Sequence, residues 1–238
     1  LLAKERSLDS RNAAHINPKD WDIAVTYLYH KWSPEQIASQ LPISHETIYR
    51  HVYADKAQGG VLYKHLRCQK KRRKRYAGGR DRRGQIIGRR PISERPNHVE
   101  KRRKIGHWEG DTLIGKGHKQ AIVSLVERKS GYAVLAKVKN KTADLVSNAI
   151  IDRLKPLMRK VSTLTYDNGK EFADHASIDH ALGSISYFAD PYSSWQRGSN
   201  ENLNGLIRQY IPKSRPLSTV SDTELAKIEG LLNNRPRK

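Results

Sequence analysis

A dense run of positive charge divides this chain into two stretches that can each form a core. Residues 64–104 carry 18 Lys and Arg against 3 Asp and Glu, a net charge of +15 out of +21 for all 238 residues. A segment of this composition repels itself and has few side chains to bury, so we expect a basic linker over residues 64–104. Folded domains are then expected at residues 1–63 and 105–238.

The concentrated charge also indicates the class of partner. Lys and Arg neutralise phosphates and release condensed counterions, so a polyanion is the expected ligand. Membrane is disfavoured, because no apolar run approaches the roughly 20 residues that span a bilayer, and the basic segment lacks the apolar face of an interfacial helix. Nucleic acid is therefore the expected partner, and a plain solvated tether is the alternative. The densest contacts with a DNA backbone are expected from Lys70, Lys71, Arg72, Arg73, Lys74 and Arg75.

The first 63 residues follow helical patterns. Ser33-Pro34-Glu35-Gln36 is typical of a helix start, with Ser as the N-cap and Gln three residues later. Leu41-Pro42 ends that short helix, and Ser44 caps the next one, expected at 45–53. Two short helices joined by a tight turn predict a small all-α helix-turn-helix module, and an ordinary helical hairpin is the alternative. The residues expected to face outward toward a groove are His45, Glu46, Tyr49, Arg50 and His51.

From residue 105 onward, short segments rich in alternating and β-branched residues predict strands. A mixed α/β domain is therefore expected. Its predicted elements are strands at 107–114, 120–127 and 132–137, a helix at 142–157, a strand at 162–166, a helix at 173–182, a strand at 185–188 and a helix at 200–210.

Three acidic residues lie in mostly apolar elements of this domain, where a charge is costly without a partner. Asp111 lies inside the first strand, Asp167 ends the fourth, and Glu201 lies in the first turn of the last helix, with 55 and then 33 residues between them. Carboxylates at strand and helix ends predict a site for two Mg²⁺ or Mn²⁺ ions that serves phosphoryl transfer. Taken singly, the three could be a solvent-facing Asp, a turn former and a helix-dipole Glu.

Longer sequence segments around these carboxylates resemble those of one transposase family. The chain is similar to the DDE transposases of the bacterial insertion sequence thirty family in five segments. Three lie in the second domain, HWEGDTLIG, LTYDNGKEF and YFADPYSSWQRGSNENLNGLIRQYIPK, and two lie upstream, WSPEQIA and ISHETIYRHVY. The resemblance implies a ribonuclease H-like catalytic domain related to retroviral-type integrases. It also implies that Asp111, Asp167 and Glu201 are the catalytic, metal-binding triad.

The resemblance further implies an activity and a set of partners. Family members cut double-stranded DNA at the ends of the element and join the freed 3′-hydroxyl to target DNA. Pairing of two ends implies a homodimer or a higher oligomer on DNA. Two alternatives remain open: a nuclease of the same fold that only hydrolyses, and a catalytically idle DNA-binding repressor derived from a transposase.

Several residues are candidates for supporting roles. Glu109 shares the strand face of Asp111, and Asn168 is expected to shape the loop after Asp167. Trp195 is expected either to stack on a base or sugar or simply to pack. Arg208, seven residues after Glu201, is expected to meet a phosphate or to be a surface cation. Glu171, His175 and His180 are expected on the surface.

The remaining observations concern the setting of the protein. Cys68 is the one cysteine, which excludes an internal disulfide or a multi-cysteine zinc site and fits a reducing bacterial cytoplasm close to the nucleoid. The chain begins without Met and ends on a basic NNRPRK, which favours a segment of a longer protein.

Overall fold

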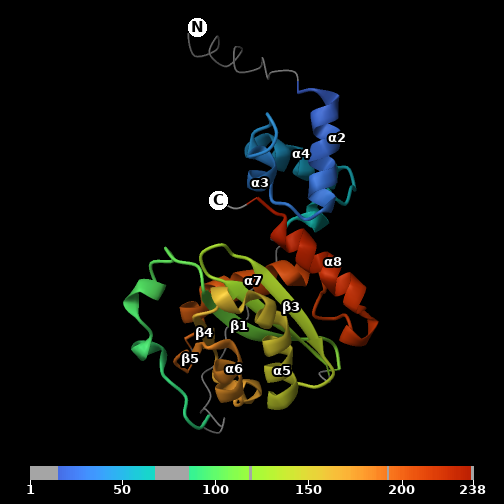
Figure 1. The fold of residues 1–238 in the computed structure, drawn as a ribbon. Coiled ribbons are helices and arrows are strands. Elements are labelled where there is room, and N and C mark those ends of the chain that lie inside the picture. Colours follow the sequence, from blue (N-terminus) through green and yellow to red (C-terminus); the bar gives the residue numbers. More distant parts are fainter. Residues whose placement is uncertain (1–15, 68–85, 118–119, 192, 237–238) are drawn as a thin grey trace. The chain divides into compact units, whose positions relative to one another are not determined.

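The computed structural model describes residues 16–67, 86–117, 120–191 and 193–236 (Figure 1). The chain forms two compact units. One comprises Leu1–Arg73 with Arg235–Lys238, and the other comprises Lys74–Asn234. Each unit has its own hydrophobic core, so the two are considered separately below.

The smaller unit is built from helices joined by short turns in its described residues. It contains α2 (Pro18–Tyr29), α3 (Pro34–Ala38), α4 (His45–Ala57) and a 3₁₀ helix, η1 (Leu62–His65). Side-chain caps begin these helices, because Ser33 forms a complete capping box with Gln36 and the Ser44 side chain accepts a hydrogen bond from the Thr47 amide. Ile37, Ile48 and Val52 are buried together, as the helical spacing predicts. Helix α4 runs four residues beyond its predicted end.

The larger unit is built on a five-stranded mixed sheet. Its strands are β1 (His107–Ile114), β2 (Ala121–Glu127), β3 (Ala133–Val138), β4 (Thr163–Tyr166) and β5 (Ile185–Phe188), in the order β3-β2-β1-β4-β5. Strands β1 to β3 pair antiparallel, whereas β4 is parallel to both β1 and β5. The mixed α/β prediction is confirmed, and β1 lies at the centre of the sheet with β4 beside it.

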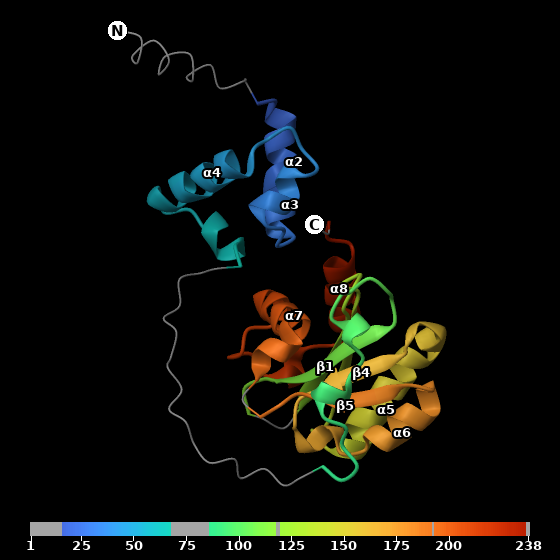
Figure 2. The same cartoon turned by 90° about the vertical axis from the view of Figure 1, so that its left-hand side faces the viewer.

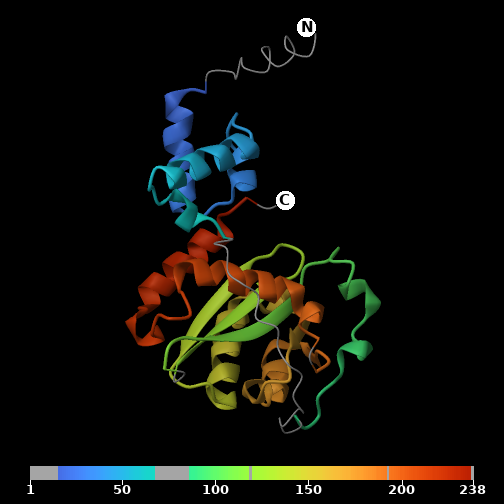
Figure 3. The same cartoon turned by 180° about the vertical axis from the view of Figure 1, so that it is seen from behind.

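Helices cover both faces of this sheet (Figure 2 and Figure 3). Helices α5 (Ala143–Leu154) and α6 (His175–Leu182) pack on one face, and α7 (Gly198–Tyr210) and α8 (Asp222–Asn233) pack on the other. Strand β2 shows why both faces need cover, since Val123 and Leu125 enter the first core and Ile122 and Val126 enter the second. Helix α8 is additional to the predicted elements.

Residues 86–104, predicted as part of the linker, pack on the sheet unit. Ile86 belongs to the core beneath α5 and α6, and Pro91 forms an isolated bridge with Phe188 at the end of β5. Two 3₁₀ turns follow, η2 (Ile92–Glu94) and η3 (Asn97–Val99). The linker interpretation therefore gives way to a packed segment for these residues, whereas Lys70 to Arg75 lie outside the described residues. No described helix is long and apolar enough to cross a membrane.

Candidate active site

Asp111 and Asp167 converge because they follow paired positions on adjacent parallel strands. The register pairs Glu109 of β1 with Thr165 of β4, and each aspartate comes two residues later in its strand direction. The Oδ2 atoms of both carboxylates face the guanidinium of Arg197, at 3.3 Å for Asp111 and 3.7 Å for Asp167. The structure thus brings two of the three predicted carboxylates to one cationic group.

The other carboxylate oxygen of each aspartate is held by the chain immediately after it. Asp111 Oδ1 accepts a hydrogen bond from the Thr112 amide at 2.8 Å, and Asp167 Oδ1 accepts one from the Gly169 amide at 2.9 Å. Asp111 Oδ2 also accepts from Asn204 Nδ2 of α7 at 2.9 Å. Burial raises the pKa of Asp111, Arg197 opposes that change, and the nearby Asp167 carboxylate adds to it. The Arg197 cation thus only partly offsets the effect of burial on the pKa of Asp111.

Glu201 lies on the same side of the unit but does not join the pair. It is exposed in the first turn of α7, between Asn200 and Asn204, which both contact the sheet. Within the described residues, no three His, Cys, Asp or Glu side chains are close enough together to hold a metal ion. The structure therefore brings the Glu201 backbone to the site through its helix and leaves its carboxylate in solvent.

A buried charge network lies behind the aspartates. Glu109 is 0% exposed, and its Oε2 accepts the Asn200 amide at 2.9 Å, which ties the first turn of α7 to β1. Its Oε1 is ion-paired with Arg128 Nε at 3.0 Å. Arg128 in turn contacts Glu100 at 2.9 Å, so Glu109 is connected both to α7 and to the segment before β1.

Arg95 extends this network to the second aspartate strand. It is ion-paired with Glu100 and donates a hydrogen bond to Thr165 Oγ1 at 2.8 Å. Burial, helped by the neighbouring Arg128 cation, lowers the pKa of Arg95 to about 10. The residues that precede Asp111 and Asp167 by two positions, Glu109 and Thr165, are thus connected through the buried Arg128 and Arg95 and the exposed Glu100 between them.

Two residues expected on the surface are buried. Glu171 is 6% exposed, accepts a hydrogen bond from Thr112 Oγ1 at 2.9 Å, and is ion-paired with Lys141 Nζ at 2.5 Å. His175 is 7% exposed and packs edge-on against Phe188. The surface prediction was wrong for both, because the partners that allow burial come from distant segments. His180 is exposed, as predicted.

The other predicted supporting residues differ in their surroundings. Asn168 Nδ2 donates to the Ala189 carbonyl at 2.6 Å, which joins the loop after β4 to the end of β5. Trp195 is 72% exposed, which contradicts a packing role. Arg208 donates to the Ile114 carbonyl at 2.8 Å, and burial lowers its pKa, so it holds α7 to the end of β1.

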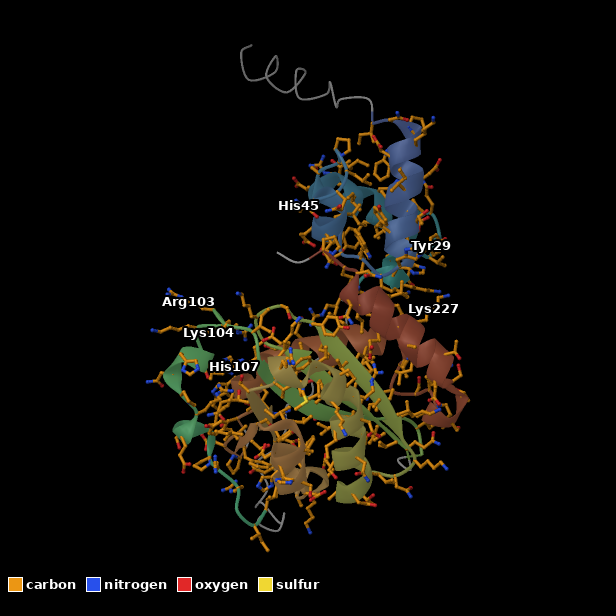
Figure 4. The ribbon with its side chains drawn as sticks, in the orientation of Figure 1. Tyr29, His45, Arg103, Lys104, His107 and Lys227 are labelled. Carbon is orange, nitrogen blue, oxygen red and sulfur yellow. The ribbon has the colours of Figure 1, made fainter. Side chains whose placement is uncertain are left out.

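The residues predicted to meet DNA in the helical unit lie on α4. His45, labelled in Figure 4, is exposed together with Glu46 and Arg50, whose side chains are 3.6 Å apart. Tyr49 is only partly exposed and donates to Glu35 Oε1 at 3.2 Å. These three charged or polar side chains of α4 are thus exposed to solvent, whereas Tyr49 links α4 to α3.

Comparison with known proteins identifies the chain's relatives. A scan of protein-family models gives no match. The chain is 44% identical to the transposase for insertion sequence element IS4351 of Bacteroides fragilis, over 90% of this chain and 68% of that protein. It is 40% identical to the transposase for IS1086 of Cupriavidus metallidurans, over 98% of this chain and 74% of the relative.

A third relative defines the family by name. Transposase InsI for element IS30A of Escherichia coli K12 is 39% identical over 91% of this chain and 60% of its own length. The sheet architecture and these similarities together define the class as transposases of insertion sequence elements. The chain belongs to the IS30 family of these transposases.

Proposed function

We propose that this protein is a DNA transposase that cleaves the ends of an insertion element and joins the 3′-hydroxyl to target DNA by metal-dependent phosphoryl transfer. The observation that carries the proposal is the convergence of the Asp111 and Asp167 Oδ2 atoms on one cationic group. The strand order β3-β2-β1-β4-β5, with β4 and β5 parallel to β1, supports a ribonuclease H-like catalytic domain.

Asp111, Asp167 and Glu201 are the residues that would hold Mg²⁺ or Mn²⁺. The donor set fits, because hard divalent cations prefer carboxylate oxygens and the two aspartates already face a positive charge. Bound in a pair, such ions activate an attacking oxygen and stabilise a leaving one.

The chain's own residues supply orientation. The Thr112 and Gly169 amides fix one oxygen of each aspartate, so the remaining oxygens are directed toward the shared position. Glu109 holds the first turn of α7, which carries Glu201, against β1 through the Asn200 amide. Such restraint favours a reactive geometry before DNA arrives.

The helical unit is proposed to be a helix-turn-helix module that binds double-stranded DNA. Helices α3 and α4 are joined by residues 39–44, and the exposed side chains of His45, Glu46 and Arg50 lie on α4. The basic residues of the segment 64–104 would add contacts with phosphates, which supply affinity without sequence information. Because two element ends must be paired, a homodimer or a higher oligomer on DNA belongs to the proposal.

A strand-joining experiment tests this function. Duplexes carrying the terminal repeats of the element, either intact or already cut at the 3′ end, are incubated with the protein, target DNA and Mn²⁺. We expect joined products with the wild type and with Asp152→Asn, which alters an exposed aspartate of α5, and none with Asp167→Asn. Hydrolysis without joining would favour a nuclease, and DNA binding without either reaction would favour a repressor.

A further inference from the structure

Arg197 occupies the position at which the two aspartates meet. It is the residue just before α7, it is 9% exposed, and its Nη1 contacts both Asp111 Oδ2 at 3.3 Å and the Gly110 carbonyl at 3.3 Å. Its Nη2 lies 3.7 Å from Asp167 Oδ2. A cation of the chain itself thus lies between the two carboxylates that would bind metal.

The contacts divide each carboxylate into a fixed oxygen and a shared one. The Oδ1 atoms accept from backbone amides within their own loops, at 2.8 Å for Asp111 and 2.9 Å for Asp167. The Oδ2 atoms instead face a long side chain with several rotatable bonds, and that of Asp111 also accepts a hydrogen bond from Asn204 Nδ2 at 2.9 Å. The backbone contacts can therefore persist when the partner of the Oδ2 atoms changes.

The pairing with Arg197 is also loose for a guanidinium. A strong arginine–carboxylate pair has two short parallel hydrogen bonds to one carboxylate, whereas Arg197 spreads two longer contacts over two carboxylates. Its Nε is buried without a hydrogen-bond partner among the described residues. A side chain held in this way stabilises the charges of both aspartates but is poorly fixed by them.

We propose that Arg197 is an exchangeable counter-cation, which holds Asp111 and Asp167 together in the metal-free protein and is displaced from their Oδ2 atoms by a divalent ion. The inference rests on the proposed function of this site. Glu201 lies in the first turn of α7, four residues after Arg197, so the departure of the guanidinium opens a place for its carboxylate beside the aspartates. The exchange thus accounts for an exposed Glu201 next to a paired set of aspartates.

Direct measurement of Mn²⁺ binding to DNA-free protein tests the exchange. Isothermal titration is carried out on the wild type, Arg197→Gln, Arg197→Lys and Asp167→Asn. Arg153→Gln is the matched control, because it removes an arginine from the Arg153–Glu229 ion pair without touching the site. Removal of a competing charge at this distance is expected to tighten Mn²⁺ binding in Arg197→Gln by about tenfold or more. Arg153→Gln should change the affinity less than about twofold, since distant exposed charges are screened.

A second readout does not depend on titration. In EDTA, Arg197→Gln should melt at a lower temperature than the wild type, because two carboxylates then face each other unneutralised. Mn²⁺ should raise its Tm by more than it raises that of the wild type. Arg197→Lys keeps a cation and is expected to bind Mn²⁺ with nearly wild-type affinity, which provides a folded comparison if the Gln variant is unstable.

The possible failures can be told apart. If the wild type and Arg197→Gln bind Mn²⁺ equally, and Asp167→Asn abolishes binding, the metal site stands and the exchange is wrong. If neither the wild type nor Arg197→Gln binds Mn²⁺, both the exchange and the proposed metal site are overturned.

Discussion

Two Arg–Glu pairs in this protein have the same chemistry and opposite surroundings. The Glu109–Arg128 pair in the sheet unit has side chains 0% and 4% exposed and a separation of 3.0 Å. The Glu46–Arg50 pair on α4 has side chains 74% and 79% exposed and a separation of 3.6 Å. The first pair belongs to a network of contacts that connects β1 with β4. The two residues of the second pair are one helical turn apart on the exposed side of α4.

The difference shows where charge stabilises structure and where it remains available to a ligand. An exposed pair in one helix contributes little to stability, because water and salt screen it. A buried pair is costly to break, because removing one partner leaves the other charge without compensation. In the sheet unit the buried charges therefore hold β1 to α7 and to the segment before β1, whereas the charged side chains of α4 remain exposed to solvent.

Removing the buried partner is expected to have the largest effect. Glu109→Gln removes the buried carboxylate of the pair and leaves Arg128 with the exposed Glu100 as its carboxylate partner, which should cost up to about 3–5 kcal/mol. For a unit of this size, that loss corresponds to a fall in Tm on the order of 10 °C. Calorimetry should show the shift in the transition of the sheet unit only. The matched change Glu46→Gln should leave both transitions unchanged within about 1 °C, and an equal effect of the two would remove the contrast.

The buried carboxylate of Glu127 should make the stability of the sheet unit dependent on pH. Burial raises the pKa of Glu127, but hydrogen bonds from Ser130, Lys129 and Gly106 outweigh it, so the pKa in the folded protein is lowered. A lowered pKa stabilises the fold above the unfolded-state value, and the stabilisation disappears as pH falls through the folded-state value. Glu127→Gln should thus cost about 1.5–3 kcal/mol at neutral pH, as loss of hydrogen bonds to a charged group does.

Denaturant titrations from pH 7 down into the acid range check this prediction. The difference between wild type and Glu127→Gln should shrink as the pH falls, because the wild-type carboxylate becomes protonated. A constant difference over that range would show that the charge of Glu127 is not what stabilises the turn.

Trp195 tests whether an exposed side chain close to the site contributes to DNA binding and not to stability. It is 72% exposed, so Trp195→Ala should leave the Tm almost unchanged. If the ring stacks on a base, affinity for a DNA end should fall by an amount equivalent to about 1–3 kcal/mol. Fluorescence anisotropy with labelled duplexes measures the affinity, and Trp195→Phe, which keeps an aromatic ring, should be affected less. Equal binding by all three proteins would assign Trp195 no part in DNA contact.

The smallest effect is expected at Arg50. Its loss removes one phosphate contact, so Arg50→Ala should reduce the log–log salt slope of DNA binding by about one and weaken binding severalfold at low salt. Stability should change by less than about 0.5 kcal/mol, because the pair with Glu46 is exposed. Binding to a mixed-sequence duplex over a range of salt concentrations provides the measurement. An unchanged slope would exclude the residue from the interface.

Much of the architecture could be predicted because its causes are local. Ser33 and Ser44 cap the helices they precede, and the strand starts at His107 and Ile185 follow from β-branched, alternating sequence. Helix α8 also has local signals, since the Ser221 side chain caps the Glu224 amide and Leu225, Ile228 and Leu232 are buried at helical spacing. Helix α8 lies beyond residue 210, where the predicted elements end.

What the sequence by itself determined was the order of the main helices and strands up to residue 210 and the positions of the three carboxylates along them, because periodicity and capping act over a few residues. Tertiary structure alone decided that Arg197 lies between Asp111 and Asp167. It also decided that Arg95, from a very basic segment, is buried against Thr165, and that Glu171 is buried in an ion pair with Lys141. The physical reason is that the cost of burying a charge depends on its partner. In each of these three cases the partner residue lies tens of residues away along the chain.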